Sequence, residues 1–447
     1  MKFEELKQAL IDAAERAGIK EYEIYYQSED SISAETLKDE ISAFSSGFSG
    51  GICFRCIVDG KMGYASGELM TKEAMEELVE KAKENAACID NDDEVFIFEG
   101  SKEYAKLPER EVKLTDASTL RETALKLQKD TYDTDSRVGD GTQTAAITFA
   151  SEIHLCNSKG LNLSNRLGTS VAYVNAVLRE GEEAQESFEF AEGYCYDDLK
   201  ALPAMAVESA LNKFGAGSVE TGKYDIVMRG KVFRDFLSTF ASVFSAKNAQ
   251  KGLSLLAGKE GQTIASECVT LVDDPMREGC PMQTPFDGEG VATARREIIS
   301  GGVLNTLLYD LTTAKKAGVE STGNGQKGSY ASPVNIAPYS FGIQAGNSTR
   351  EELFEAVGNG VFITSAKGFH AGANPVTGDF SIESEGFMIR NGKRAEAVKS
   401  FTIAGNFFEL LKSVDRLGDT IEWGLPGSLT IFGSPDALIR GASIAGK

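Results

Sequence analysis

The distribution of glycine constrains the fold of this 447-residue chain more than any other feature of its sequence. More than half of the 46 glycines lie after residue 222, where short apolar runs recur between Gly, Asn and Asp turns. Turn residues at such short intervals are typical of a sandwich or barrel of antiparallel strands. Residues 223–447 are therefore predicted to form a large, mainly antiparallel β domain, with helices only around 230–246 and 406–415.

The first hundred residues combine a helical period with a strand period. Apolar residues between Phe3 and Ala14 recur every three or four positions, which places them on one face of a helix. The Asp59-Gly60 pair predicts a tight hairpin turn between two β-rich stretches, and Thr71 predicts the start of a second helix. These elements indicate a small α+β unit at residues 1–100.

A second unit is expected after the polar, irregular stretch at 101–113. A helix at about 116–130 precedes three β-rich stretches, and a further helix follows them. The chain is therefore predicted to be an α+β protein in which small helix-plus-antiparallel-sheet units precede the large β domain. The predicted domains are residues 1–100, 114–218 and 223–447.

The formal net charge of −21 limits the partners that this chain can bind. An acidic surface repels polyanions, so direct contact with nucleic acid or with an anionic membrane is not expected. The N-terminal segment lacks the basic and apolar regions of a signal peptide, and no long uncharged apolar stretch predicts a membrane span. Seven scattered cysteines, an odd number, indicate reduced thiols and a cytoplasmic location.

Only two histidines, His154 and His370, are available for chemistry in the whole sequence. The His-Glu-x-x-His motif is absent, and most other zinc sites are disfavoured because they need more histidines. His154 lies in an alternating strand, where a structural role is the better interpretation. His370 lies in the Gly-rich loop 368–375, which is of the kind that holds functional groups.

Acidic residues follow that loop at Asp379, Glu383 and Glu385. Residues 383 and 385 share one face of a strand, which suits an acid/base or cation-binding role, although a solvated strand face explains them equally well. Cys53 and Cys56 have the CxxC spacing of redox and metal sites, but strand alternation sends their side chains to opposite faces. Two buried core thiols are therefore expected.

Several motifs resemble those of the TldD/PmbA peptidase family, in the same order along essentially the whole chain. The most specific is Thr-Pro-Phe-Asp-Gly-Glu-Gly-Val at residues 284–291, which is followed by Arg-Arg-Glu-Ile-Ile at 295–299. Similar matches occur at 321–324, at 374–380 and at 402–406. The resemblance implies an α+β N-terminal part and a β-rich C-terminal domain, in agreement with the pattern of turns and periods.

The family has two kinds of member, and the TldD kind carries a His-Glu-x-x-x-His helix and a downstream Cys that hold a catalytic metal. The corresponding helix here is identified as 233–244, which contains neither His nor Glu, and the Cys position falls at about Glu383. The chain therefore resembles the PmbA kind, also called TldE, which pairs with TldD in a peptidase for flexible peptides. The resemblance implies no metal in this chain and a zinc-like divalent metal in a TldD-type partner subunit.

Within this hypothesis, loops around Asp287, Glu289, Arg296 and Asn374 are expected to bind or position the peptide, because turns of a β domain commonly carry binding groups. The competing interpretation is that the glycines in these motifs only allow the backbone to turn. An older family label, modulator of DNA gyrase, suggests a DNA-linked partner, but the net charge of −21 argues against contact with DNA itself.

Two other functions stay open. The chain could act as a stand-alone homodimeric peptidase that uses His370 with Asp379 or Glu383, or that holds an adventitious divalent metal on those carboxylates. A non-catalytic module for flexible peptides would instead bind peptide without any turnover.

Overall fold

One six-stranded antiparallel sheet dominates the N-terminal lobe in the computed structural model, which describes residues 2–90, 94–107, 112–426 and 428–447. The strand order is β3-β2-β1-β4-β5-β6. In chain order the strands are β1 (Glu21–Leu37), β2 (Glu40–Val58), β3 (Lys61–Gly67), β4 (Gln143–Asn157), β5 (Asn162–Glu180) and β6 (Glu183–Glu192). Strands β1 and β4 pair along their length, so the segments before and after 101–113 share one sheet. The predicted division into 1–100, 114–218 and 223–447 stays a prediction.

The predicted hairpin joins β2 to β3. Val58 pairs with Lys61, and the two residues between them, Asp59 and Gly60, have φ values of 50° and 75°. Two consecutive left-handed residues form the turn whose twist matches that of antiparallel strands. The identity of the two residues Asp59 and Gly60 is therefore enough to predict the turn.

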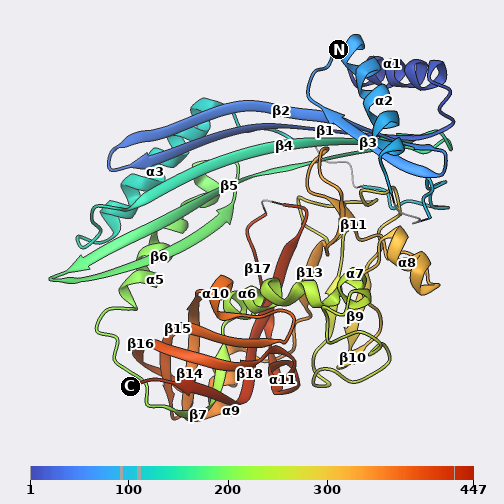
Figure 1. Cartoon of the computed structure of the whole chain (residues 1–447). Helices are drawn as coiled ribbons and strands as arrows, with labels where there is room; N and C mark the ends of the chain where they lie inside the picture. Colours follow the sequence, from blue (N-terminus) through green and yellow to red (C-terminus); the bar gives the residue numbers. More distant parts are fainter. Residues whose placement is uncertain (1, 91–93, 108–111, 427) are drawn as a thin grey trace.

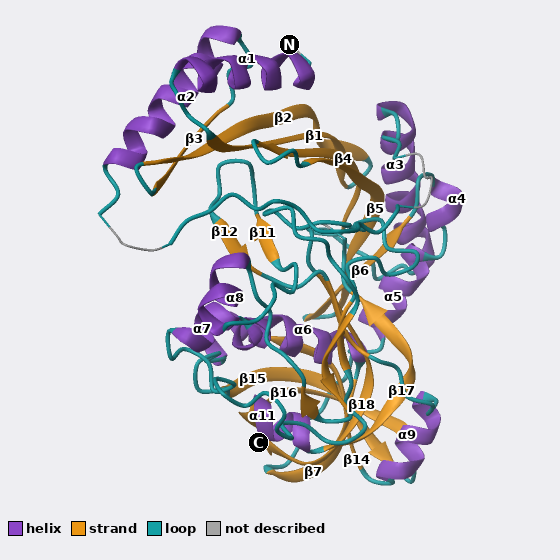
Figure 2. Cartoon of the chain, turned by 90° about the vertical axis from the view of Figure 1, so that its right-hand side faces the viewer, coloured by secondary structure: helices purple, strands orange, loops and turns teal. Residues whose placement is uncertain are grey.

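Helices cover one face of the six-stranded sheet, and the C-terminal lobe lies against the other (Figures 1 and 2). The helices are α1 (Phe3–Arg16), α2 (Lys72–Ala87), α3 (Ala117–Thr134), α4 (Tyr196–Leu199) and α5 (Leu202–Leu211). Cys56 packs in the core under α1 and α2, whereas Cys53 packs with Phe286 of the C-terminal lobe. The two sulfurs thus point to opposite faces, as strand alternation predicts, and all seven cysteines are free.

Five strands close into a ring in the C-terminal lobe, because β18 pairs with β16 and also with β7. These strands are β7 (Gly222–Met228), β14 (Gly360–Lys367), β15 (Asp379–Arg390), β16 (Lys393–Asn406) and β18 (Ile431–Ala445). The same sheet extends through β17 (Val414–Trp423), β13 (Ser340–Ile343), β8 (Leu271–Asp273), β9 (Arg296–Ser300) and β10 (Val303–Leu304). A separate hairpin consists of β11 (Gly325–Lys327) and β12 (Val334–Ile336). The predicted α+β class and the mainly antiparallel C-terminal domain are confirmed.

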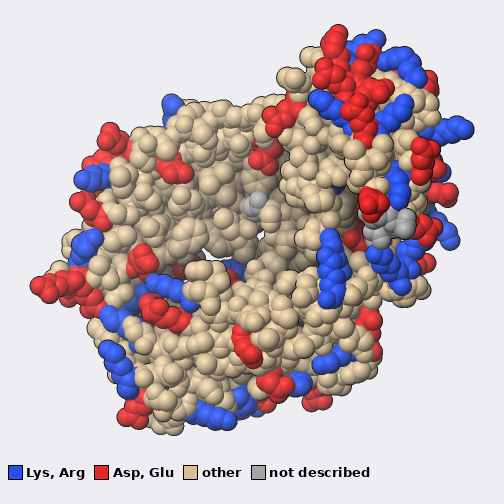
Figure 3. All heavy atoms as spheres, in the orientation of Figure 1, with Lys and Arg blue, Asp and Glu red and all other residues tan. Residues whose placement is uncertain are grey.

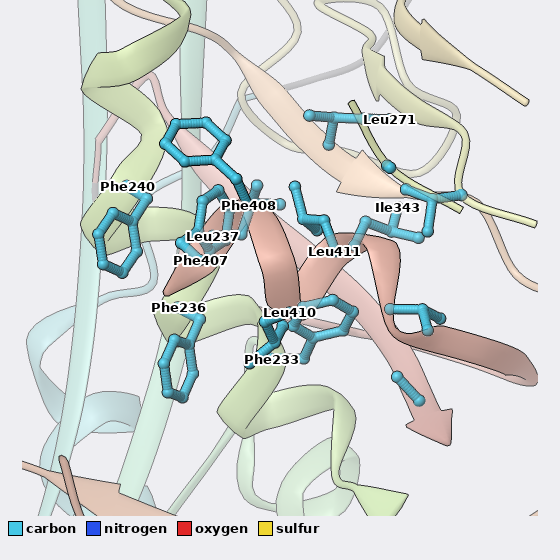
Figure 4. Packing of buried hydrophobic residues seen from close by; sticks show 14 of the residues in the cluster. Phe233, Phe236, Leu237, Phe240, Leu271, Ile343, Phe407, Phe408, Leu410 and Leu411 are labelled. Carbon is cyan, nitrogen blue, oxygen red and sulfur yellow. The ribbon is translucent and has the colours of Figure 1, made fainter. Parts of the chain in front are cut away.

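Helix α6 (Gly230–Phe240) carries the aromatic core of this lobe, and Figure 4 shows its side chains packed against the segment around Phe407. The Phe240 and Phe407 rings are stacked with their centres 4.5 Å apart. Phe236 meets Phe380 of β15 edge to face at 4.8 Å. Each buried phenylalanine side chain contributes about 1.5–3 kcal/mol through its removal from water, so the core fixes the orientation of α6.

Further short helices correct the expectation that this lobe contains only the helices around 230–246 and 406–415. The 3-10 helix η1 (Ala241–Phe244) continues α6 within the expected range 230–246. The additional elements are α7 (Ala246–Gln250), α8 (Leu311–Ala317), α9 (Arg350–Val357) and α10 (Phe369–Gly372), beside the expected α11 (Phe407–Lys412). They are too short to show an apolar period. Helices α8 and α9 begin instead at the N-caps Asp310 and Thr349, whose side chains accept hydrogen bonds from backbone N–H groups. Among the described residues, none of the helices combines the length and apolar character that a membrane span requires.

Candidate functional site

The surface is hollowed between the two lobes (Figure 3). Helices α6 and α10 lie on the side of the C-terminal lobe that faces the six-stranded sheet (Figure 1). One cavity at the junction of the lobes has a volume of about 470 Å³. We call it the cleft, and its walls come from β6 and α5 on one side and from α6, β14 and β15 on the other.

The polar side of α6 consists of residues at helical spacing: Lys231, Arg234, Asp235 and Ser238. Lys231 lines the cleft and donates a hydrogen bond to the Phe188 carbonyl at 2.9 Å. Burial lowers the pKa of the Lys231 ammonium group. The helix therefore presents cations and one carboxylate on the side opposite its phenylalanines.

Strand β6 lies at the edge of the sheet and forms one wall of the cleft. Lys213 donates a hydrogen bond to the Glu186 carbonyl at 2.8 Å, as Lys231 does to Phe188, so two lysines cover alternate outward carbonyls of this edge. Such protection is common on edge strands. The Phe188 side chain stays 42% exposed and Met205 of α5 is also exposed, so the cleft offers apolar side chains beside charged ones.

Two predicted peptide-binding residues, Asp287 and Glu289, are buried beneath the sheet. Both Asp287 oxygens accept backbone hydrogen bonds, from Glu289 and Val291 at 2.9 Å and from Gly325 at 2.9 Å. Glu289 Oε2 accepts a hydrogen bond from the Leu311 backbone at 2.9 Å. Burial, followed by the nearby Asp287 carboxylate, raises the pKa of Glu289. The contacts of Asp287 and Glu289 therefore hold the backbone around them in place. A role of these two residues in peptide binding stays a prediction.

The other two predicted peptide-binding residues lie apart from this pair. Arg296 is in β9, where its Nε donates a hydrogen bond to the Thr322 carbonyl at 3.3 Å. Asn374 is exposed, and its Oδ1 accepts a hydrogen bond from the Val376 backbone at 3.0 Å, which forms a turn. Neither side chain lines the cleft.

The predicted catalytic residues lie around α10 and β15. His370 is exposed on α10, while Asp379 and Glu383 are exposed on the same outward face of β15. A hydrogen bond from Asn406 Nδ2 at 2.9 Å helps to hold the pKa of Asp379 below its usual range. Within the part of the chain that the structure describes, no hydrogen bond or ion pair joins His370 to either carboxylate. Their catalytic role stays a prediction.

His154 contributes to the packing of the N-terminal lobe. Its ring stacks on Phe3 with the centres 4.2 Å apart, and its Nε2 lies 2.7 Å from Glu152 Oε1. These contacts are those of a structural residue.

The sequence motif at 284–291 connects the lobes. Tyr104 donates a hydrogen bond to the Gly290 carbonyl at 2.8 Å, and Asn165 of β5 donates one at 3.1 Å to the carbonyl of Gln283, the residue before the motif. Gly290 has φ 84°, and a Cβ there would lie 2.5 Å from the Leu161 side chain. The motif therefore holds the C-terminal lobe beneath the sheet.

Sequence reasoning missed the residues of the cleft, including Lys213, Lys231 and Phe188. The one local signal is the alternation of Phe188 and Phe190 with acidic residues in β6. That alternation predicts a strand with an apolar face but does not reveal that α6 and β14 lie opposite it.

A helix-covered antiparallel sheet that meets a β-rich lobe across a cleft defines a two-lobed α+β protein. Models of the PmbA/TldA metallopeptidase domains match the chain: domain 1 at residues 22–86, the central domain at 108–214 and the C-terminal domain at 221–446. The chain therefore belongs to the TldD/PmbA family of metallopeptidases.

Individual relatives extend over almost the whole chain. An uncharacterized protein of Methanocaldococcus jannaschii is 30% identical over 93% of this chain and 95% of its own length. The crystal structure of TldE from Thermococcus kodakarensis has a TM-score of 0.89 at 26% identity, covering 98% of this chain and 100% of that one. A proposed modulator of a DNA gyrase from Thermotoga maritima has a TM-score of 0.88 at 28% identity, covering 99% and 100%.

The family name implies a metal ion, and the donor groups of the residues that the structure describes do not fit one. Among residues 2–90, 94–107, 112–426 and 428–447, no three His, Cys, Asp or Glu side chains are grouped so that they could hold a metal. On the polar side of α6, Asp235 is the only residue of a type that commonly binds zinc, beside Lys231 and Arg234.

Proposed function

We propose that this chain is the PmbA/TldE-type subunit of a TldD/PmbA peptidase complex, in which it binds flexible peptides and a TldD-type partner carries the divalent metal. The supporting observation is the polar side of α6, which carries Lys231, Arg234 and Asp235, in a helix without His or Glu. The family resemblance identifies residues 233–244 as the counterpart of the helix that bears the metal ligands in the TldD kind. Cations at these positions repel a metal ion. In this proposal the TldD-type partner subunit supplies the metal that cleaves the peptide bond.

The cleft supports the peptide-binding part of the proposal. Its volume of about 470 Å³ suits a few residues of a peptide. Phe188 and Met205 offer exposed apolar contacts, and the edge of β6 offers backbone groups to an extended chain. Displacement of Lys213 and Lys231 from the β6 carbonyls would free that edge, and the lysines would then meet peptide carbonyls instead.

The deciding experiment measures cleavage of an unstructured peptide by this protein alone, by a TldD-type protein alone and by their mixture, each with and without a chelator. The proposal predicts chelator-sensitive cleavage in the mixture that exceeds the sum of the separate proteins. Equal cleavage by the TldD-type protein with or without this chain would overturn it.

The two alternative functions give different results in the same assay. A stand-alone homodimeric peptidase would cleave without the partner, and His370→Ala would abolish that turnover. A peptide-binding module would bind the peptide but leave cleavage unchanged in every mixture. Size-exclusion chromatography of the protein alone and with the partner distinguishes the homodimer from the mixed complex.

A location in the cytoplasm and the absence of direct nucleic-acid or membrane contact are part of the proposal. The net charge of −21 supports the second part, because it disfavours binding to polyanions. The seven free cysteines support the location, because they suit a reducing compartment.

A further inference from the structure

A second cavity, of about 600 Å³, lies between the sheet and the C-terminal lobe and shares no lining residue with the cleft. We call it the lysine pocket. Its floor includes Arg55 of β2 and Tyr64 of β3, and its walls come from α7, α8 and the β11–β12 hairpin. Both lobes therefore contribute to it.

Positive charge gathers in the lysine pocket although the chain as a whole is strongly acidic. Its basic lining residues are Arg55, Lys247, Lys251, Lys316 and Lys327, and its acidic ones are Glu289 and Asp310. Arg55 is already paired with the buried Glu23, so the charge open to a ligand comes from the lysines. Both acids already have partners, because Asp310 caps α8 by accepting from the Thr313 backbone at 2.8 Å and Glu289 accepts from the Leu311 backbone. The pocket is thus suited to an anion.

Lys327 is the buried cation of this pocket. The residue is 9% exposed, and its Nζ lies 4.8 Å from the centre of the Tyr25 ring. Among the described residues, no carboxylate lies within ion-pair distance of Lys327, nor of Lys247 and Lys251 nearer the surface. An ammonium group that has lost its water without gaining a counter-ion is costly. A bound anion would supply that counter-ion.

The remaining lining is partly apolar and limits the kind of anion. Met62, Tyr64, Pro333 and Val334 line the same cavity. Cavities of this size commonly enclose a ligand of several tens of atoms at most, with a few polar groups that fix its orientation. The lining therefore matches a ligand that has one anionic group and an apolar side chain.

We infer that the lysine pocket binds the carboxylate of a small ligand, either an amino acid or the free C-terminus of a short peptide, with Lys327 as its counter-ion. The apolar residues contact the side chain beside that carboxylate. This inference does not rest on the proposed function, because the cleft and the lysine pocket are separate cavities.

Isothermal titration of the full chain with acetyl-Ala-Leu and with its C-terminal amide tests the inference. The acid is expected to bind about tenfold or more tightly than the amide, because only the acid offers a charge-assisted contact. Lys327→Met, and separately the pair Lys247→Ala and Lys251→Ala, should weaken binding of the acid and reduce its advantage over the amide. The paired variant keeps the test valid if Lys327→Met does not fold.

Two control variants separate this site from other sites. Lys81→Ala removes an exposed lysine of α2 and should leave the titration unchanged. Lys412→Met removes an exposed lysine of α11 that lines neither cavity and should preserve the preference for the acid. Binding of free leucine as well as the peptide acid would identify an amino acid ligand, and binding of the peptide alone would identify a C-terminus. Equal binding of acid and amide, full competition by inorganic phosphate, or no binding at millimolar ligand would overturn the inference.

Discussion

Arg55 of β2 donates a hydrogen bond at 3.0 Å to Glu23, its direct cross-strand partner on β1. Both side chains are largely buried, on the face of the sheet that meets the C-terminal lobe. Burial opposes the charge on Arg55, but the Glu23 carboxylate, together with the nearby Glu289, outweighs it, so the pKa of the guanidinium is raised. The interface between the lobes thus contains a buried ion pair.

Arg55→Met should therefore be strongly destabilising, since it leaves Glu23 buried without its partner. Loss of one member of a buried pair costs about 3–5 kcal/mol, and urea unfolding measures it. The double variant Glu23→Gln and Arg55→Met should recover part of the loss. Arg16→Met, which removes an exposed pair with Glu76, is the control and should cost less than about 1 kcal/mol. Equal losses for Arg55→Met and Arg16→Met would contradict the prediction.

Glu289 should make stability depend on pH. Its raised pKa means that the folded protein retains a proton that the unfolded chain releases. This stabilising contribution is present at low pH and is lost as pH rises from the ordinary Glu range through the raised pKa. Glu289→Gln cannot ionise, so its Tm relative to wild type should increase between about pH 5 and about pH 9. Parallel curves of Tm against pH for the two proteins would show that Glu289 does not titrate in this way.

Gly63 of β3 allows α2 to lie directly on the sheet. A Cβ at this position would lie 2.0 Å from the Ala82 carbonyl oxygen and 2.5 Å from the Ala86 backbone nitrogen. Gly63→Ala must shift the helix and should cost about 1–3 kcal/mol, measured by chemical denaturation. Gly47→Ala in β2 is the matched control, because a Cβ there meets no atom within 4 Å. A loss no larger than that of the control would mean that α2 moves without strain.

Phe188 should contribute to peptide binding in the cleft without contributing much to stability. Phe188→Ala in the mixture with a TldD-type subunit is expected to raise KM about tenfold and to change kcat little, as loss of an apolar anchor does. Phe48→Ala is the control, since Phe48 is another exposed phenylalanine of the same sheet, 64% exposed, and does not line the cleft. An unchanged KM for Phe188→Ala would remove the cleft from the peptide path.

The local elements of this fold are largely predictable. The apolar period between Phe3 and Ala14 places α1, Thr71 caps α2 by accepting from the Ala74 backbone, and Asp59-Gly60 forms the hairpin turn. Each depends on residues close together in the chain. Strand alternation likewise separates Cys53 from Cys56. The short helices of the C-terminal lobe were missed because four to eight residues contain too few turns to show a period.

The positions of the predicted site residues follow from the sequence less well than the elements of the fold do. The sequence identifies the family motif at 284–291, but tertiary packing buries Asp287 beneath a sheet whose neighbouring core residues, between Tyr25 and Leu167, lie more than a hundred residues earlier. His370 and Glu383 are close in sequence, yet among the described residues no hydrogen bond joins them. Proximity in the chain therefore does not determine contact between side chains, and the catalytic role of these residues stays a prediction.

The sequence by itself determined the α+β class, the turns, the acidic charge and the family resemblance, because these follow from composition, period and motif. Only the tertiary structure decided that β1 pairs with β4, that Phe188 faces α6 across the cleft, and that Lys327 is buried against Tyr25. The physical reason is that side-chain period specifies which face of an element is buried but not which distant element covers it. That choice depends on packing among segments that are tens to hundreds of residues apart, and both cavities exist only where those segments meet.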